Sequence, residues 1–461
     1  MQKNQNFTEG RILSPLIRFA LPVLLALILQ AAYGAVDLLI VGWFGSSADV
    51  SAVSTGSQLM HTVTAVIVGL AMGITVLAGQ KIGEKRPDEA GDAIGSGIAL
   101  FAVVTVILTA AMLILSRSLT AVLKAPPEAF DQTVAYVRIC AAGTAFIVAY
   151  NVLGSVFRGI GDSKMPLITV AIASILNVFG DLLFVAGFGM GAAGAAWATV
   201  LAQGASVLLS FVFIRRRALP FDFSLKRIRF DGRVIRKILV LGAPIAAQDL
   251  LVSISFLVIM AIVNSLGLVA SAGVGVAEKL CTFIMLVPSA YMQSMSAFVA
   301  QNIGAGKLSR ARKALFYGIA SSFAISIPVC YFSCFHGEIL AGLFVRGSET
   351  EVIAAAADYL KAYGIDSLLT SFLFCFLGYF NGCGNTMFVL LQGIAGAFCV
   401  RIPVSYFMSR TAGATLFRIG LATPASTVVQ IVLCFACLYW QNRRAARGLA
   451  LRGDFRLKNN A

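Results

Sequence analysis

The chain has 461 residues, of which 59% are hydrophobic and only 12% are charged, and its mean hydropathy is +0.87. Soluble globular proteins carry roughly a quarter of charged residues, so this chain has too little polar surface for a water-exposed fold. The composition excludes disordered, collagen-like, coiled-coil and disulfide-rich secreted proteins. The net charge of +15 indicates an interaction with a lipid bilayer in preference to nucleic acid.

Twelve apolar segments are long enough to cross a membrane, since a hydrocarbon core requires about 20 residues of helix. The sequence therefore predicts an all-α polytopic membrane protein. The even number of spans predicts that both termini lie on the same side. In chain order the segments are 16–42, 51–80, 92–116, 132–156, 165–187, 192–214, 238–265, 270–300, 312–335, 355–380, 387–408 and 419–440.

Basic residues concentrate in alternate loops. The segment between the sixth and seventh spans, 215–237, contains nine Lys and Arg residues, and the tail after Trp440 is also basic. The positive-inside rule then predicts cytoplasmic N- and C-termini in a plasma (inner) membrane protein. A nucleic-acid or lipid-binding patch is the alternative for 215–237, but an orientation signal and connector on anionic headgroups is favoured.

The sequence contains an internal repeat at an offset of 221 to 223 residues. Because each copy holds six spans, the copies share an orientation and are related by a pseudo-twofold axis along the membrane normal. This predicts an N-lobe (1–214), a connector (215–237), a C-lobe (238–441) and a cytoplasmic tail (442–461), with a central cleft typical of secondary transporters. The matching motifs are ALP at 20–22 with GAP at 242–244, GQKIG at 79–83 with AQNIG at 300–304, and FRGIGD at 157–162 with FNGCGN at 380–385.

Acids within spans are expensive and are functional candidates by default. Gln30, Tyr33 and Asp37 are spaced to share one face of the first span. Asn177 and Asp181 share one face of the fifth, and Thr199 on the sixth reaches a similar depth. These groups are expected to form one polar pocket in the outer half of the N-lobe.

The repeat supplies an internal control for this pocket. Asp37 corresponds to Ile259, and Asn177 and Asp181 correspond to Val400 and Val404. A purely architectural carboxylate would be needed in both copies, so the asymmetry favours a functional role. The pair is expected to hold a proton, since two close carboxylates in a low-dielectric pocket cannot both be charged cheaply. Pro22 is the expected hinge of the first span.

Other ionisable groups within spans are candidates for the substrate cleft, with a solvated charge as the alternative. They are Asp249, Glu278 and Asp366, together with Gln30 from the first span. Cys434 and Cys437 lie in an apolar run without a second pair or a nearby histidine, so no metal site is expected. No catalytic cluster is visible, and an enzyme is not predicted.

Four segments together resemble the multidrug and toxic compound extrusion (MATE) family over essentially the whole chain. They are YGAVDLLIVGWFG (33–45), FRGIGDSKMP (157–166), NVFGDLLFV (177–185) and FVAQNIGAGK (298–307). The resemblance implies a two-lobe, twelve-span antiporter that exports bulky, often cationic organic compounds in exchange for H⁺ or Na⁺. It implies small organic molecules and the bilayer as partners, no cofactor, and a monomer.

The resemblance also assigns roles by position. The acid of the family's first span matches Asp37, the Asn-x-x-x-Asp pair of the DinF-like and archaeal branch matches Asn177 and Asp181, and the polar residue of the sixth span matches Thr199. The acids that NorM-like and plant members carry on spans seven and ten fall at Val252 and Thr370. Ion coupling is therefore expected in the N-lobe.

Two other classes of protein remain as alternatives. A flippase for lipid-linked oligosaccharides would share the lobe plan, but such proteins often have additional spans and a strongly basic cleft. An integral membrane enzyme would need a nucleophile or metal cluster at membrane depth. Twelve spans and scattered intramembrane charges of both signs favour the antiporter.

Overall fold

The protein is α-helical throughout the part of the chain that the computed structural model describes, which comprises residues 7–215, 220–221, 224–344, 349–411, 413 and 415–446. No strand occurs within these ranges. Within these ranges eleven helices are long and apolar enough to cross a membrane, and the bent pair Pro127–Ala142 and Thr144–Gly159 makes a twelfth span when it is counted as one. The prediction of an all-α protein with twelve membrane spans is confirmed.

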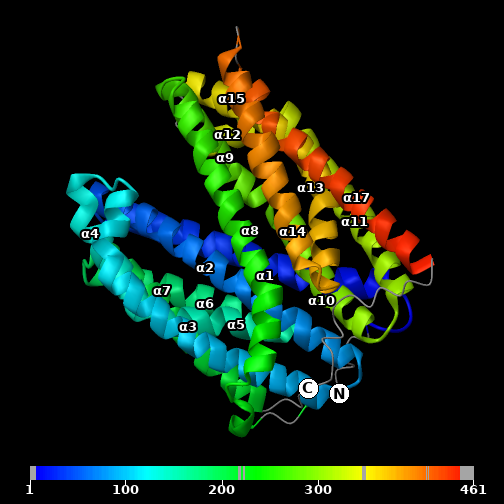
Figure 1. Cartoon of the computed structure of the whole chain (residues 1–461). Helices are drawn as coiled ribbons and strands as arrows, with labels where there is room; N and C mark the ends of the chain where they lie inside the picture. The colour runs from blue at the N-terminus through cyan, green and yellow to red at the C-terminus, as the bar shows by residue number, and fades with distance from the viewer. Residues whose placement is uncertain are drawn as a thin grey trace. The chain divides into compact units, whose positions relative to one another are not determined.

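The first six spans are formed by α1 to α7 and the short helix η2 (Figure 1). The helix α2 begins with a capping box, in which Ser46 and Asp49 exchange hydrogen bonds, and α3 begins with a proline. The bounds are α1 (Leu13–Phe44), α2 (Ser47–Gly83), α3 (Pro87–Val122), η1 (Pro127–Ala129), α4 (Phe130–Ala142), α5 (Thr144–Gly159), α6 (Lys164–Asp181), η2 (Leu182–Gly187) and α7 (Gly191–Arg215).

The last six spans follow the short helix η3 (Leu225–Arg227). These helices are longer than the apolar segments predicted from the sequence, because the polar residues at the ends of the segments are also helical. The bounds are α8 (Gly232–Asn264), α9 (Leu268–Ile284), α10 (Leu286–Gly304), α11 (Leu308–Phe335), α12 (Gly337–Gly342), α13 (Thr350–Gly382), α14 (Thr386–Ile394), η4 (Ala395–Arg401), α15 (Ile402–Arg410), α16 (Leu416–Gly420) and α17 (Ala422–Ala446).

Two kinds of irregularity interrupt the spans. The fourth span bends by 57° between α4 and α5. The break lies at Gly143, where the side chain of Val200 occupies the space that a Cβ atom would need. The elements η2 and η4 are π-helices, which insert an extra residue per turn and occur often at functional sites. They directly follow Asp181 and end at Arg401, respectively.

The described chain forms two compact units. Unit 1 contains residues up to Ala247 together with Ala300–Arg310, and unit 2 contains Gln248–Val299 and the chain from Ala311 onward. The first part of α8 joins unit 1 because Ile238, Leu241 and Ile245 are buried in the same apolar core as α2 and α3. The lobe boundaries 1–214 and 238–441 stay a prediction. Parts of the connector (216–219, 222–223) and of the tail (447–461) lie outside the described residues.

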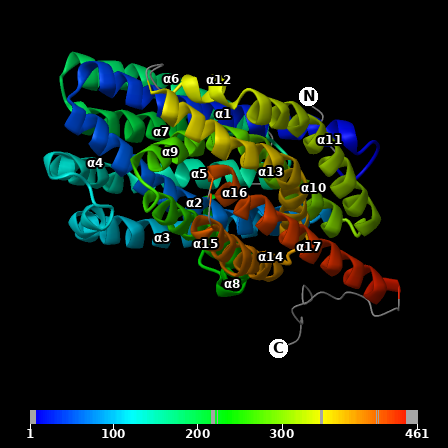
Figure 2. The ribbon, with the colours of Figure 1, turned by 90° about the horizontal axis from the view of Figure 1, so that it is seen from above.

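Each unit is organised around a buried helix. In unit 1, α2 contacts α1, α3, α4, α5 and α7, and α3 lies beside α4 in both views (Figure 2). In unit 2, α13 packs against α9, α12, α16 and α17, and α17 also contacts η4. Both central helices are apolar and largely buried, which is the expected pattern for a helix surrounded by other spans.

The repeat is visible in one packing contact of unit 1. A Cβ atom on Gly83 of α2 would collide with the carbonyl oxygen of Gln301 on α10. A Cβ atom on Gly304 of α10 would collide with the carbonyl oxygen of Gln80 on α2. The two contacts exchange corresponding residues of the two copies, as a twofold relationship requires.

Candidate functional site

Three helices of unit 1 bring together the polar residues that the sequence singled out. Asp37 comes from α1, Asn177 and Asp181 come from α6, and Thr199 comes from α7. The exposed fractions of Asp37, Asn177 and Asp181 are 7%, 1% and 0%, and Thr199 is half-buried. The helical spacing of four residues from Asn177 to Asp181 puts both on the face of α6 that meets α1 and α7.

The hydrogen bonds within this cluster are few and long. Thr199 Oγ1 donates to Asp37 Oδ2 at 3.5 Å, and Asn177 Nδ2 donates to Thr199 Oγ1 at 3.4 Å. The carboxyl groups of Asp181 and Asp37 are close enough to influence each other electrostatically. However, neither oxygen of Asp181 has a hydrogen-bond partner of good geometry within the described chain, and Asp37 Oδ1 and Asn177 Oδ1 also lack one.

This arrangement of two carboxyl groups is suited to binding and releasing a proton or a small cation. Among the described residues, neither Asp37 nor Asp181 forms an ion pair with a basic side chain. Two facing buried carboxylates without a cation repel each other and lose hydration. A proton between them turns the contact into a hydrogen bond, and a bound cation would satisfy the free oxygens.

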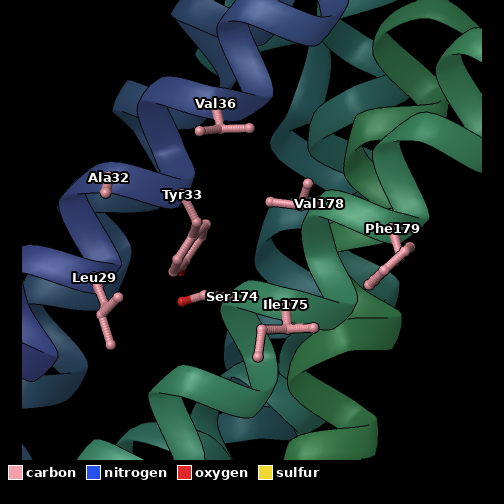
Figure 3. A pocket seen from close by; sticks show the side chains of 8 residues that line it. All are labelled: Leu29, Ala32, Tyr33, Val36, Ser174, Ile175, Val178 and Phe179. Atoms are coloured by element: carbon pink, nitrogen blue, oxygen red, sulfur yellow. The ribbon is translucent and has the colours of Figure 1, made fainter.

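Tyr33 connects the cluster to an apolar groove. Its hydroxyl interacts with the side-chain amides of Gln30 and Gln203 and lies within the electrostatic field of Asp37. The groove has a volume of about 330 Å³ and is open to the surroundings of the helices. Figure 3 shows the Tyr33 ring crossing the space between α1 and α6 toward Ser174. The lining residues are Leu29, Ala32, Tyr33, Val36, Ser174, Ile175, Val178 and Phe179.

Two further residues lie near the carboxyl pair and were not predicted from the sequence. Gln203 follows Thr199 by one helical turn on the same face of α7 and is 8% exposed, so the spacing rule used for Asn177 and Asp181 could have found it. Tyr136 of α4 is 4% exposed and lies within the electrostatic field of Asp37 and Asp181. For Tyr136 no such spacing rule applies, because a tyrosine within an apolar span does not by itself indicate a functional site.

The acids expected in the cleft of the second lobe are not all in one place. Asp366 of α13 is 1% exposed, while Glu278 of α9 is half-buried, and both act electrostatically on Cys281. Asp249 of α8 is half-buried, and among the described residues neither of those acids influences it electrostatically. Pro22, the expected hinge, lies within α1, which continues without a break from Leu13 to Phe44.

The sequence profile of the MatE family matches residues 22–183 and 244–407. The two matched segments begin 222 residues apart and each covers one copy of the internal repeat. The chain belongs to the MatE family. Membership confirms the resemblance inferred from the sequence and agrees with a transporter rather than an enzyme.

Proteins described as multidrug resistance or export proteins are similar to this chain over most of their length. The probable multidrug resistance protein YpnP of Bacillus subtilis (strain 168) is 28% identical, and the similarity covers 96% of this chain and 98% of that protein. The multidrug export protein MepA of Staphylococcus aureus (strain MW2) is 24% identical, with coverages of 89% and 90%.

Solved structures of MATE transporters share the fold. A structure described as the outward-facing conformation of a multidrug resistance MATE family transporter has a TM-score of 0.89 at 21% identity. A crystal structure of MATE in complex with MaL6 has the same TM-score and identity. Both matches cover 97% of this chain and 99% of the other.

Proposed function

We propose that this MATE protein is a secondary active multidrug efflux antiporter. It exports organic, often cationic compounds across the plasma membrane in exchange for H⁺ (or Na⁺), and it acts as a monomer with both termini in the cytoplasm. The relatives named as multidrug resistance and export proteins support the substrate class. The proximity of the Asp37 and Asp181 carboxyls, neither of which pairs with a basic side chain among the described residues, carries the assignment of the coupling site.

The coupling site consists of Asp37, Asp181, Asn177, Thr199 and Tyr33. With the carboxyl pair ionised, the pocket attracts a cationic substrate or an inward-moving ion. A proton that enters the pair removes one of its two negative charges, which weakens that attraction and changes the hydrogen bonds of Asn177 and Thr199. The helix α1 can then repack around Pro22, because a proline leaves one backbone carbonyl without its helical donor.

Tyr33 makes substrate binding and ion binding interdependent. It lines the apolar groove between α1 and α6 and also lies in the field of Asp37. An aromatic, cationic compound in the groove contacts the Tyr33 ring and is attracted by the carboxylate, as cation–π and charge interactions both favour. Protonation of Asp37 weakens the second attraction, so ion entry and substrate release occur in one cycle.

A transport experiment tests this proposal. Efflux of a fluorescent organic cation is driven by a pH gradient in vesicles, and separately by a Na⁺ gradient. We expect Asp37→Asn and Asp181→Asn to abolish coupled efflux at matched expression, and Asp131→Asn, an exposed residue outside the site, to leave it intact. If Asp37→Asn and Asp181→Asn keep full coupled transport while Asp249→Asn and Asp366→Asn abolish it, the coupling site is wrongly assigned.

The same vesicle preparation distinguishes the other candidate functions. If the protein binds a lipid-linked oligosaccharide and has no affinity for organic cations, it is a flippase and not an antiporter. Dependence of efflux on the Na⁺ gradient alone would select Na⁺ as the coupling ion. Cysteine-accessibility labelling of the connector 215–237 checks the orientation, and labelling from outside the cell would contradict it.

A further inference from the structure

The segment in front of α1 is held in unit 1 through its backbone. Residues 7–11, which we call the strap, have five consecutive carbonyl groups, and each accepts a hydrogen bond from a side chain of the segment 300–310. Asn302 Nδ2 and Lys307 Nζ donate to the first and second carbonyls at 3.2 and 2.9 Å. Arg310 donates to the first, third, fourth and fifth at 2.6–3.0 Å.

The strap packs beside the backbone contact between α2 and α10. Phe7 is fully buried, and its ring meets that of Phe19 at 5.0 Å. A Cβ atom on Gly161 would lie 3.5 Å from the Phe7 ring and 3.1 Å from the side-chain amide of Gln301. The carbonyl of Gln301 is the one that meets Gly83 of α2. The strap therefore belongs to the same packed cluster as the α2–α10 contact.

The repeat contains a counterpart of the strap with different chemistry. At the offset of 222 residues, EGR at 9–11 corresponds to DGR at 231–233, directly in front of α8. There Arg227 donates to the acids Asp88 and Asp92 of α3, and its carbonyl fills the space of a Cβ atom on Gly95. Each copy of the repeat thus holds the segment that leads into the first helix of the other copy.

The two attachments differ in how well they are shielded from water. The side chain of Asp88 is 75% exposed, so its pair with Arg227 is screened by water and salt. The strap instead combines a fully buried Phe7 with a half-buried Arg310 that donates to neutral carbonyls. The attachment of the strap is therefore the stronger of the two.

The strap continues through Ile12 into α1, the helix that carries Tyr33 and Asp37. In a transporter that rocks one repeat against the other, the end of unit 1 at which α2 and α10 touch has to separate in one half of the cycle. The segment 300–310 cannot move away from the start of α1 while the six hydrogen bonds to the strap remain.

We propose that the strap keeps the α2–α10 end of unit 1 closed, that it is released when this end opens, and that Arg310 is the positioning residue that controls the release. The inference rests on the proposed function for the cycle, whereas the closure itself requires neither substrate nor coupling ion. Arg310→Gln removes several charge-assisted hydrogen bonds, so we expect it to shift the ratio of open to closed protein by about 5- to 30-fold.

Hydrogen–deuterium exchange of the full chain in lipid nanodiscs, measured by mass spectrometry without substrate, tests this inference. In Arg310→Gln we expect about 5- to 30-fold faster exchange in peptides covering 80–86 and 301–307, the two sides of the α2–α10 contact, because exchange follows the population of the open state. Peptides covering 47–53, at the other end of α2, should exchange as in the wild type. A purely structural role for Arg310 would speed exchange there as well.

Lys307→Gln is a milder variant, because it removes only one hydrogen bond to the strap, and it should speed exchange in the same two regions by a smaller factor. Arg86→Gln is the matched control. Arg86 occupies the position of Lys307 in the first copy and pairs with Glu89 at 3.1 Å, so exchange in 301–307 should stay at the wild-type rate. Wild-type exchange in Lys307→Gln, or an equal increase along the whole chain in Arg310→Gln, would overturn the inference.

A reversible cross-link tests whether transport requires release of the strap. Thr8→Cys combined with Lys307→Cys is joined by a bis-methanethiosulfonate reagent, since the Lys307 ammonium reaches the Thr8 carbonyl in the native chain. We expect the cross-link to abolish efflux of the fluorescent cation and a reductant to restore it. The two single variants, treated identically, should remain active and control for the native cysteines. Full efflux by cross-linked protein would refute the inference.

Failure of the proposed function gives a different result. If the coupling site is wrongly assigned, Asp37→Asn and Asp181→Asn keep coupled transport, while the exchange of 80–86 and 301–307 still responds to Arg310→Gln. If the strap has no such role, the exchange does not respond, while Asp37→Asn and Asp181→Asn still abolish coupled efflux.

Discussion

The side chain of Arg310 binds the main chain of Phe7 although the two residues are 303 positions apart in the sequence. Arg310 Nε donates to the Phe7 carbonyl at 2.9 Å, and the two Nη atoms donate to the carbonyls of Glu9, Gly10 and Arg11 at 2.9, 2.6 and 3.0 Å. Phe7 is fully buried and contacts the Phe19 ring edge-on at 5.0 Å. The segment 7–11 therefore fastens Ala300–Arg310 to the rest of unit 1.

We expect Arg310→Gln to destabilise the protein by about 1–2 kcal/mol, since it removes several charge-assisted hydrogen bonds from a half-buried site. Arg310→Lys should lose most of the same stability because an ammonium group cannot reach four carbonyls with a planar fork. Thermal unfolding in detergent measures both. Lys313→Gln, an exposed charge on the same helix, is the control and should melt like the wild type. Equal melting of Arg310→Gln and Lys313→Gln would contradict the prediction.

The connector is fastened to unit 1 in a related way. Arg227 of η3 pairs with Asp88 at 2.6 Å and with Asp92 at 3.2 Å, and the Asp88 carboxylate raises the pKa of Arg227. Both acids lie in the first turns of α3. We expect the double change Asp88→Asn with Asp92→Asn to speed tryptic cleavage after Arg227, because it removes both of these ion pairs and leaves the hydrogen bond to the Asp88 carbonyl.

High salt should produce the same effect in the wild type, since exposed ion pairs are screened. Asp131→Asn, which breaks an exposed pair with Arg117 elsewhere on unit 1, is the matched control and should be cleaved at the wild-type rate. Cleavage that is independent of both salt and the α3 acids would show that other contacts of the connector, such as the buried Phe221, hold it in place.

Hydrophobicity and repetition were sufficient to predict the spans. Apolar segments mark the twelve spans because the bilayer imposes one requirement on all of them. Face spacing also predicted that Asp37, Asn177 and Thr199 meet, since helical periodicity determines which residues of a span share a side. These predictions depend on local rules that the sequence carries directly.

Features that depend on packing could not be predicted. The bend lies at Gly143, where Val200 of another helix occupies the space that a Cβ atom would need. The π-helix that ends at Arg401 changes which side chains face the neighbouring helices, and no residue pattern predicts it. Tyr136 joins the carboxyl cluster through the position of α4, which only the tertiary structure gives.

Asp231 gives a prediction of pH dependence outside the spans. Its carboxylate accepts hydrogen bonds from the backbone N–H groups of Arg233 and Val234 at the start of α8, at 2.9 and 3.3 Å. The Val234 N–H, followed by that of Arg233, lowers the pKa of Asp231. A group whose pKa is lowered on folding contributes stability above its unfolded pKa, about 3.9, and loses it as the pH falls through the folded value.

We therefore expect Asp231→Ala to melt at a lower temperature than the wild type at pH 7, by an amount corresponding to about 1 kcal/mol. The difference should shrink as the pH is lowered below about 4, where the wild-type carboxylate is protonated. Asp231→Asn keeps an oxygen acceptor without a titrating group, so its own melting should show no loss of this contribution on acidification. A deficit of Asp231→Ala that stays constant with pH would refute the role of the charge.

The reciprocal contact of Gly83 and Gly304 gives the last prediction. An alanine at either position would place a methyl group on a backbone carbonyl of the opposite helix. Since backbone cannot yield as a flexible side chain does, we expect Gly83→Ala and Gly304→Ala each to cost about 1–3 kcal/mol, measured by thermal unfolding in detergent. The two losses should be similar because the contacts exchange equivalent residues of the repeat.

Gly275 of α9 is the matched control, as nothing lies within 4 Å of its missing Cβ atom. Gly275→Ala should leave stability unchanged or raise it by up to about 1 kcal/mol, because alanine is the better helix former. A loss at Gly83 without a loss at Gly304 would mean that the two ends of the contact are not equivalent. The close approach of α2 and α10 would then belong to one copy of the repeat and not to the symmetry between the copies.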